Sequence, residues 1–102
     1  MHGLAHITGG GIAGNLVRIL PAGVRAEVDP RAWPVPPLFQ LIQRGGRVSD
    51  DEMRDVFNLG VGLVAALPAD AVDAARSAAT AAGVETWVIG SVRAGAVGVK
   101  FI

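Results

Sequence analysis

Three consecutive glycines near the start of the chain constrain the fold more than any other feature. Residues 6–15 read His-Ile-Thr-Gly-Gly-Gly-Ile-Ala-Gly-Asn, so a short apolar run ends in residues that lack a β-carbon. Such residues permit positive φ angles and a close approach of the backbone to a ligand. Apolar residues then recur at helical spacing over residues 12–20. We therefore expect the glycines at a helix N-terminus, where free amides and the helix dipole attract a phosphate or carboxylate.

The composition predicts a single soluble domain spanning residues 1–102. Hydrophobic residues make up 51% and charged residues 18% of the chain, which argues against disorder. Nine basic residues balance nine acidic ones without a basic stripe, so no nucleic-acid partner is expected. The absence of cysteine excludes disulfides and thiolate zinc ligands and fits a cytoplasmic location. No apolar stretch is long enough to span a membrane, and residues 1–20 do not resemble a signal peptide.

The pattern of apolar residues and chain breakers predicts an α+β fold. We expect helices packed on one face of a mixed, partly antiparallel sheet. Ser49 and Glu52 form a capping box, and Pro37 fits the first position of a helix. The last two strands are joined by a short turn and are expected to form a hairpin. The expected strands are residues 4–8, 24–28, 61–67 (buried), 86–92 and 97–102, and the expected helices are residues 12–20, 38–44 (stopped by the glycines at 45–46), 50–57 and 69–82.

The glycine stretch also fits a dinucleotide-binding motif. Gly9 to Gly14 satisfies G-x-G-x-x-G between an expected strand and an expected helix. Glu27 and Asp29 lie near the end of the next strand, where a ribose-binding acid is expected. A dinucleotide fold, however, needs successive parallel βαβ units. The proline-rich segment 33–37 and the expected terminal hairpin interrupt such a series.

The same stretch has two other interpretations besides an anion site. A nucleotide triphosphatase loop is excluded because Asn15 and Leu16 stand where Lys and Ser or Thr are required. A tight turn without a ligand, in which the glycines serve only close packing, is the plainer alternative. Thr8 beside the glycines and Asn15 one turn into the helix add hydrogen-bonding groups, which favours the anion site over the plain turn.

Further blocks of sequence lie in order along nearly the whole chain. They read His-Ile-Thr-Gly-Gly-Gly-Ile at 6–12, Trp-Pro-Val-Pro-Pro-Leu-Phe at 33–39, Glu-Met at 52–53, Phe-Asn-Leu-Gly-Val-Gly at 57–62 and Trp-Val-Ile-Gly at 87–90. Together they resemble the C-terminal domain of aminoimidazole ribonucleotide synthetases, also called phosphoribosylformylglycinamidine cyclo-ligases. Several blocks are specific to these enzymes rather than to related families such as selenophosphate synthetase.

This resemblance implies an ATP-dependent ligase of purine biosynthesis that closes the imidazole ring of formylglycinamidine ribonucleotide. In the family, ATP and Mg²⁺ are bound mainly by an N-terminal domain, through which the subunits also pair. The C-terminal domain forms the other wall of the active-site cleft. The N-terminal domain is absent from this sequence, so we expect the chain to require no cofactor by itself and to be inactive alone. The partners it implies are a ribonucleotide substrate, the N-terminal domain and further copies of the chain in a homo-oligomer. A pure scaffold or dimerisation domain is an alternative.

The residue types and the resemblance together select the candidate site. The expected substrate- or phosphate-binding residues are Thr8, Gly9, Gly10, Gly11, Asn15 and Asn58. Asn58 either faces the same cleft or only caps a helix end. His6 is a candidate proton shuttle or hydrogen-bond donor, or else a core histidine bonded to the backbone. The acidic run at 50–52 complements a helix N-terminus, so no metal site is expected.

Overall fold

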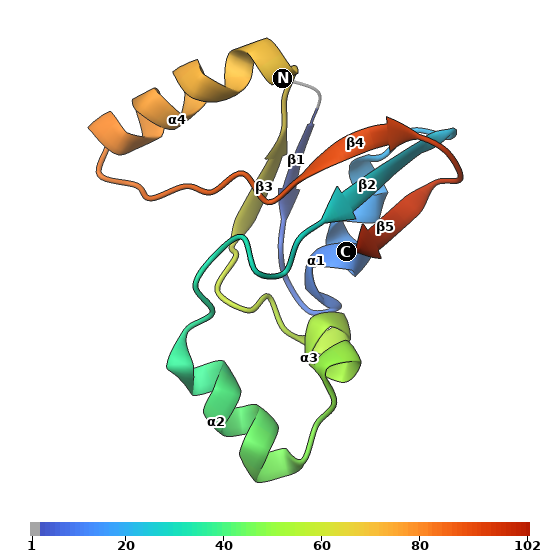
Figure 1. Ribbon diagram of the computed structural model, residues 1–102, viewed down its shortest axis with the longest axis vertical. Helices are drawn as coiled ribbons and strands as arrows, with labels where there is room; N and C mark the ends of the chain where they lie inside the picture. The colour runs from blue at the N-terminus through green and yellow to red at the C-terminus, as the bar shows by residue number, and fades with distance from the viewer. Residues whose placement is uncertain (1–2) are drawn as a thin grey trace.

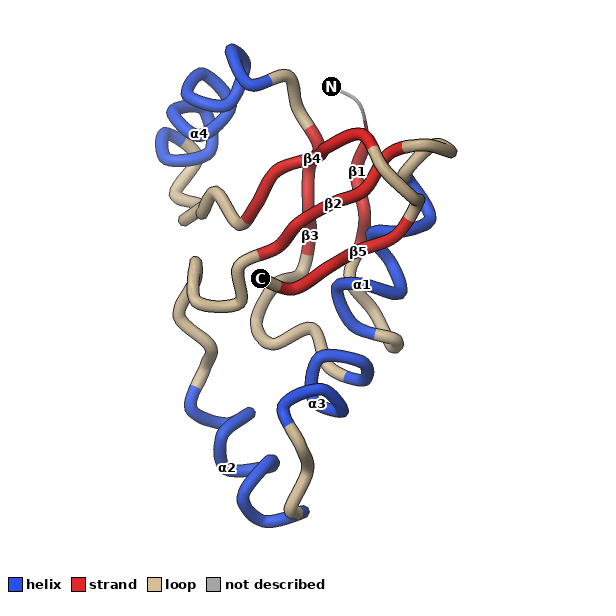
Figure 2. The backbone as a smooth tube through the Cα atoms, turned by 45° about the vertical axis from the view of Figure 1, so that its right-hand side comes forward, coloured by secondary structure: helices blue, strands red, loops and turns tan. Residues whose placement is uncertain are grey.

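The computed structural model describes residues 3–102, and its strands form two separate sheets (Figure 1). In the first sheet, β1 (Gly3–His6) pairs antiparallel with β3 (Leu63–Ala66). In the second, β2 (Val24–Val28) lies between β4 (Gly90–Ala94), which is antiparallel to it, and β5 (Gly98–Phe101), which is parallel. Figure 2 shows that the strands of the two sheets run in different directions. The α+β class with mixed strand pairing is confirmed, although the strands divide into two sheets instead of one.

The predicted hairpin of the last two strands is wrong, because β2 lies between β4 and β5. The connection at residues 95–97 passes over the beginning of β2, where the Gly95 amide donates to the Gly23 carbonyl at 3.0 Å. Ala26 and Val28 are buried on the inner face of β2. Because β2 is central, it has hydrogen-bond partners on both edges. If β4 and β5 paired with each other as a hairpin, one edge of β2 would lose its partner.

Four helices accompany the sheets. They are α1 (Gly11–Leu16), α2 (Pro37–Gly46), α3 (Asp50–Val56) and α4 (Val72–Ala81), and short 3₁₀ turns occupy Val17–Ile19 (η1) and Ala69–Ala71 (η2). The predicted capping box is present, since the Ser49 hydroxyl accepts from the Glu52 amide at 3.2 Å. The glycines at 45–46 do not stop α2 as predicted. The helix continues through them and ends where Arg47 adopts φ 54°.

The buried core lies where α1 meets the two sheets. α1 contacts β1, β5 and α3, and its Ile12 is almost completely buried, as is Val28 in β2. The buried hydrophobic residues are Ala5, Ile7, Ile12, Leu16, Ala26, Val28, Trp33, Met53 and Leu59. By contrast, α2 and α4 project from the sheets in Figure 1 and contain no buried residue.

Two predicted strands differ in extent and burial. The strand expected at 61–67 is shorter than predicted. The prediction that it is buried is wrong, because only one face of the two-stranded sheet is turned to the core. Leu63, for example, is 59% exposed. The strand expected at 86–92 begins only at Gly90, although the Ile89 carbonyl already accepts from the Asp29 amide. No helix among residues 3–102 has the length and apolar character needed to cross a membrane.

Candidate functional site

The glycine turn, residues 8–11, connects β1 to α1. Gly10 has φ 98° and Gly11 has φ 71°, conformations that side chains rarely adopt. The Gly11 amide donates to the Thr8 carbonyl at 3.2 Å, which closes the turn, and α1 begins at this residue. The expected strand–glycine–helix order is therefore present, with a helix shorter than predicted.

The three glycines serve different physical purposes. A β-carbon on Gly11 would collide with the Arg54 carbonyl of α3 and lie 3.1 Å from the Phe57 carbonyl oxygen. No heavy atom lies within 4 Å of a β-carbon built on Gly9 or Gly10. Gly11 thus allows α1 to pack directly on the end of α3, whereas Gly9 and Gly10 border open space.

Asn15 holds the glycine turn from inside the protein. Its side chain is 4% exposed, and Nδ2 donates to the carbonyl oxygens of Gly11 at 2.7 Å, Thr8 at 3.2 Å and Gly9 at 3.4 Å. Its Oδ1 accepts from the Thr8 hydroxyl at 3.0 Å. The sequence indicated that Asn15 is a hydrogen-bonding residue near the glycines. It did not indicate that the side-chain amide of Asn15 is used within the turn. The Gly11–Asn15 spacing of one helical turn, typical of side-chain bonding back to the backbone, was the available signal.

The amides of the glycine turn are therefore unequally engaged. The Gly11 amide is used by the turn, but neither the Gly9 nor the Gly10 amide donates a hydrogen bond to any residue from 3 to 102. The Thr8, Gly9 and Gly11 carbonyls of the same turn accept from Asn15. Exposed residues with unengaged donors, beside acceptors that are already bonded, make a local environment that suits a negatively charged group.

A second turn, here called the asparagine turn (residues 58–61), lies beside the glycine turn. The Gly62 carbonyl at its end accepts from the Ile7 amide at 2.9 Å, and the preceding Phe57 lies against Gly11. Within the asparagine turn, the Oδ1 atom of Asn58 accepts from the Gly60 amide at 2.9 Å. The structure thus brings together two blocks that are far apart in the sequence, and it gives Asn58 a local structural contact.

His6 is exposed on β1, directly opposite Leu63 of β3. Its neighbours Ala5 and Ile7 are buried, so alternation turns His6 and Thr8 away from the core. The interpretation of His6 as a core histidine is therefore wrong. The imidazole is available at the end of the strand that leads into the glycine turn.

The acids expected for a dinucleotide site have other partners. The Glu27 carboxylate accepts from Arg93 Nε at 2.6 Å. The Asp29 carboxylate accepts from the Arg31 amide and then from its guanidinium, and these bonds lower the pKa of Asp29 below its ordinary value. β1 and β2 lie in different sheets, so the parallel βαβ unit of the dinucleotide interpretation is not formed by these strands.

The acidic residues at the start of α3 are engaged with nearby side chains. Asp50 accepts from Gln43 at 2.7 Å, and Asp51 pairs with Arg54 at 3.5 Å. Among residues 3–102 there is no group of three or more His, Asp or Glu side chains that could hold a metal ion.

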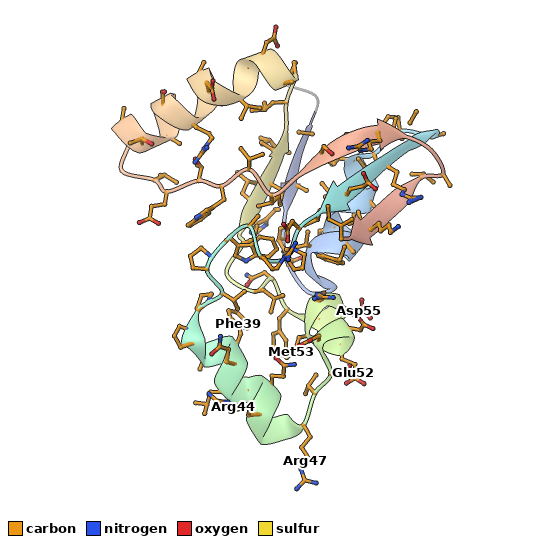
Figure 3. The ribbon with its side chains drawn as sticks, viewed as in Figure 1. Phe39, Arg44, Arg47, Glu52, Met53 and Asp55 are labelled. Carbon is orange, nitrogen blue, oxygen red and sulfur yellow. The ribbon has the colours of Figure 1, made fainter. Side chains whose placement is uncertain are left out.

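A small hollow that the sequence did not indicate lies between α2 and α3. Its volume is about 180 Å³, and Phe39 and Met53 line it from the two helices (Figure 3). The hollow is smaller than most small-molecule sites, which measure about 300–1,000 Å³. The glycine turn therefore remains the stronger candidate site.

Comparison with known proteins identifies the family. Residues 1–101 match the family described as AIR synthase related protein, C-terminal domain. The chain belongs to this family. It is 52% identical over 92 residues to the phosphoribosylformylglycinamidine cyclo-ligase of Burkholderia multivorans, a match covering 90% of this chain and 26% of that protein. It is 50% identical over 96 residues to the enzyme of the same name from Thermosynechococcus vestitus, covering 94% of this chain and 28% of the relative.

The chain thus spans about a quarter of the length of the cyclo-ligases it matches. Within this AIR synthase related domain, three of the sequence blocks noted above meet in space. The block at 6–12 contacts the block at 57–62 through Gly11 and Ile7. The block at 33–39 joins them through Trp33, whose indole NH donates to the Leu59 carbonyl at 3.1 Å. These three blocks therefore form one connected region around the glycine turn.

Proposed function

We propose that this chain acts as the substrate-side domain of an ATP-dependent phosphoribosylformylglycinamidine cyclo-ligase. The proposed reaction converts formylglycinamidine ribonucleotide to 5-aminoimidazole ribonucleotide in purine biosynthesis. Activation of the formyl oxygen as a phosphate ester would allow the neighbouring nitrogen to close the ring, with loss of phosphate. Support comes from the family match and from relatives about half identical in sequence.

The proposal divides the work between this domain and the rest of the enzyme. Because the chain spans only about a quarter of its relatives, we assign ATP and Mg²⁺ binding mainly to the remaining part. This domain would supply a surface for the ribonucleotide, act together with the N-terminal domain, and be inactive by itself. We expect the complete enzyme to act in the cytoplasm.

The observation that carries the local proposal is the pair of unengaged amides at Gly9 and Gly10. They would donate to the ribose phosphate of the substrate, or to a phosphoryl group in transit, without any displacement of protein atoms. Gly9 and Gly10 are exposed, and Asn15 keeps the turn in its present shape. His6 would serve as a hydrogen-bond donor or proton shuttle nearby, and Asn58 would line the same region.

Titration followed by NMR tests the phosphate site directly. Ribose 5-phosphate and, separately, inorganic phosphate are added to ¹⁵N-labelled protein. We expect saturable shifts of the Gly9 and Gly10 amides, and weaker binding in Gly9→Ala, where a methyl group would occupy the open space. Gly14→Ala is the matched control, because Gly14 is an exposed helical glycine with nothing near its β-carbon position. Equal binding by wild type and Gly9→Ala, or no shift at either amide, would contradict the site.

An activity assay tests the division of work. The chain is mixed with a Burkholderia multivorans cyclo-ligase from which the matching region has been removed. We expect ADP release from formylglycinamidine ribonucleotide only in the mixture. Formation of a complex without ADP release would count against the proposal and favour a scaffold. Saturable binding of NAD by the chain alone would favour the dinucleotide interpretation.

A further inference from the structure

The outer face of the second sheet carries more positive than negative charge. Alternate residues of β2 are buried in the core, so Arg25 and Glu27 lie on its other face. The strand register places Arg93 of β4 opposite Arg25, and Lys100 of β5 opposite Glu27. In Figure 2, β2 lies between these two strands. The outer face of the three strands therefore holds three cations and a single carboxylate.

Arg25 and Arg93 are like charges in directly opposite positions. Side chains so placed have β-carbons about 4.5–5.5 Å apart, and like charges there repel each other. The ion pair with Glu27 engages Nε of Arg93, whose side chain is still 70% exposed. Neither Arg25 nor Lys100 forms an ion pair with any residue from 3 to 102. The described chain thus leaves two cations of this face without a counter-charge.

The surface beside Arg25 is bare backbone. Gly98 of β5 lies directly opposite Arg25, and no heavy atom lies within 4 Å of a β-carbon built on Gly98. The neighbouring strands of a sheet are about 4.8 Å apart, so the backbones that carry Arg93 and Lys100 are separated by about 10 Å across β2. An extended anion can therefore lie across the three strands without displacing a side chain at Gly98.

The facing arginines suit phosphate better than carboxylate. The oxygens of a phosphate group point in several directions, so one group can accept from two guanidinium groups that face each other. The two oxygens of a carboxylate lie in one plane and match the fork of one guanidinium. A second or third linked phosphate would extend from the arginines toward Lys100.

We propose that Arg25, Arg93, Gly98 and Lys100, here called the cationic face, bind a chain of two or more linked phosphate groups. Such a chain is supplied by inorganic polyphosphate or by a nucleotide. The charge of this face sets the requirement for an anion, and the separation of its cations sets the length of that anion. This inference does not rest on the proposed function, which concerns the glycine turn.

NMR titration of the ¹⁵N-labelled chain tests the site. Phosphate, pyrophosphate and tripolyphosphate are added separately at a constant ionic strength of about 0.15 M, where nonspecific attraction is largely screened. We expect saturable shifts of the Gly98 and Lys100 amides and of Arg25 Nε, with affinity rising along this series. Equal affinity for ATP and tripolyphosphate would show that the phosphate chain is sufficient, whereas tighter binding of ATP would identify a nucleotide. No saturable shift at these groups, or equal affinity for one phosphate and three, would overturn the proposal.

Neutral variants test which charges are responsible. Arg25→Gln and Lys100→Gln should each weaken tripolyphosphate binding by about two- to fivefold, the effect typical of one exposed charge pair. Arg44→Gln is the matched control, because it removes the same charge from an exposed arginine of α2. Equal weakening by Arg44→Gln would show nonspecific attraction and refute the site.

Two further measurements separate this site from other occupants and from the glycine turn. Tighter binding of polyglutamate than of tripolyphosphate at the cationic face would refute the phosphate ligand and indicate an acidic protein segment instead. The Gly9 and Gly10 amides report on the glycine turn in the same spectra. The cationic face and the proposed function can therefore fail independently.

Discussion

The glycine turn and the asparagine turn lie next to each other, but their asparagine side chains bond to the backbone in opposite ways. In the glycine turn, Asn15 supplies donors to three carbonyls. The amides of Gly9 and Gly10 are left without an acceptor among the described residues. These two amides are therefore the donors that the glycine turn leaves free.

In the asparagine turn, Asn58 accepts from two backbone amides. The side-chain oxygen of Asn58 accepts from the Gly60 amide, and its backbone oxygen accepts from the Val61 amide at 3.0 Å. The Leu59 carbonyl is also engaged, by the indole of Trp33. An asparagine therefore organises each turn, Asn15 by donating to carbonyls and Asn58 by accepting from amides. The following substitutions test this difference, in order of decreasing effect on stability.

Gly11→Ala should have the largest effect on stability. Its methyl group would meet the Arg54 carbonyl at a positive φ angle, so α1 must move away from α3. We expect a loss of about 3–5 kcal/mol in the free energy of unfolding, measured by urea denaturation. Gly10→Ala is the control, because it has a positive φ but open space and should cost about 1 kcal/mol. Equal losses in the two variants would show that contact with α3 does not decide the role of Gly11.

Asn15→Ala should have the next largest effect, because it removes one buried side chain that satisfies several carbonyls. We expect a loss of about 2–4 kcal/mol in the free energy of unfolding. Hydrogen exchange at the Gly9 and Gly10 amides of the folded variant should change as the turn loosens. Asn58→Ala, which removes an exposed hydrogen bond, should cost about 1 kcal/mol. If Asn58→Ala lost more free energy of unfolding than Asn15→Ala, the asparagine turn would depend more on its asparagine than the glycine turn does, which would contradict this prediction.

Trp33→Phe tests the asparagine turn on its own. It leaves the Leu59 carbonyl without its buried donor, and we expect a loss of about 1–3 kcal/mol in the free energy of unfolding. Trp33 forms no hydrogen bond with the amides of Gly9 and Gly10. The NMR shifts that phosphate causes at these two amides should therefore remain. Disappearance of those shifts in a folded Trp33→Phe protein would show that the two turns act as one unit.

Local signals in the sequence predicted the local features well. The alternation over residues 24–28 predicted β2 with its observed bounds, and Ser49 with Glu52 predicted the start of α3. The position of the glycine turn between a strand and a helix was predicted as well. In each case the physical cause lies within a few residues of its effect.

Features that depend on distant contacts were not predictable in this way. The turn signal at residues 93–96 shows that the chain reverses, but it does not show that β2 separates β4 from β5. The three glycines look equivalent in sequence. Gly11 differs from the other two only because α3, which is distant in the chain, packs against it in the fold. Similarly, Trp33 reaches Leu59 across 26 positions in the chain.

Gly9→Ala should have the smallest effect on stability and the largest on the proposed anion site. Its β-carbon meets no atom within 4 Å, so the free energy of unfolding should change by no more than about 0.5 kcal/mol. We expect the same methyl group to hinder the approach of a phosphate oxygen to the neighbouring amides, so affinity for ribose 5-phosphate should fall. Paired urea denaturation and NMR titration separate these two quantities. A variant that is unchanged in both would mean that the open side of the glycine turn is not a ligand site, since nothing else in the described chain requires Gly9 to lack a side chain.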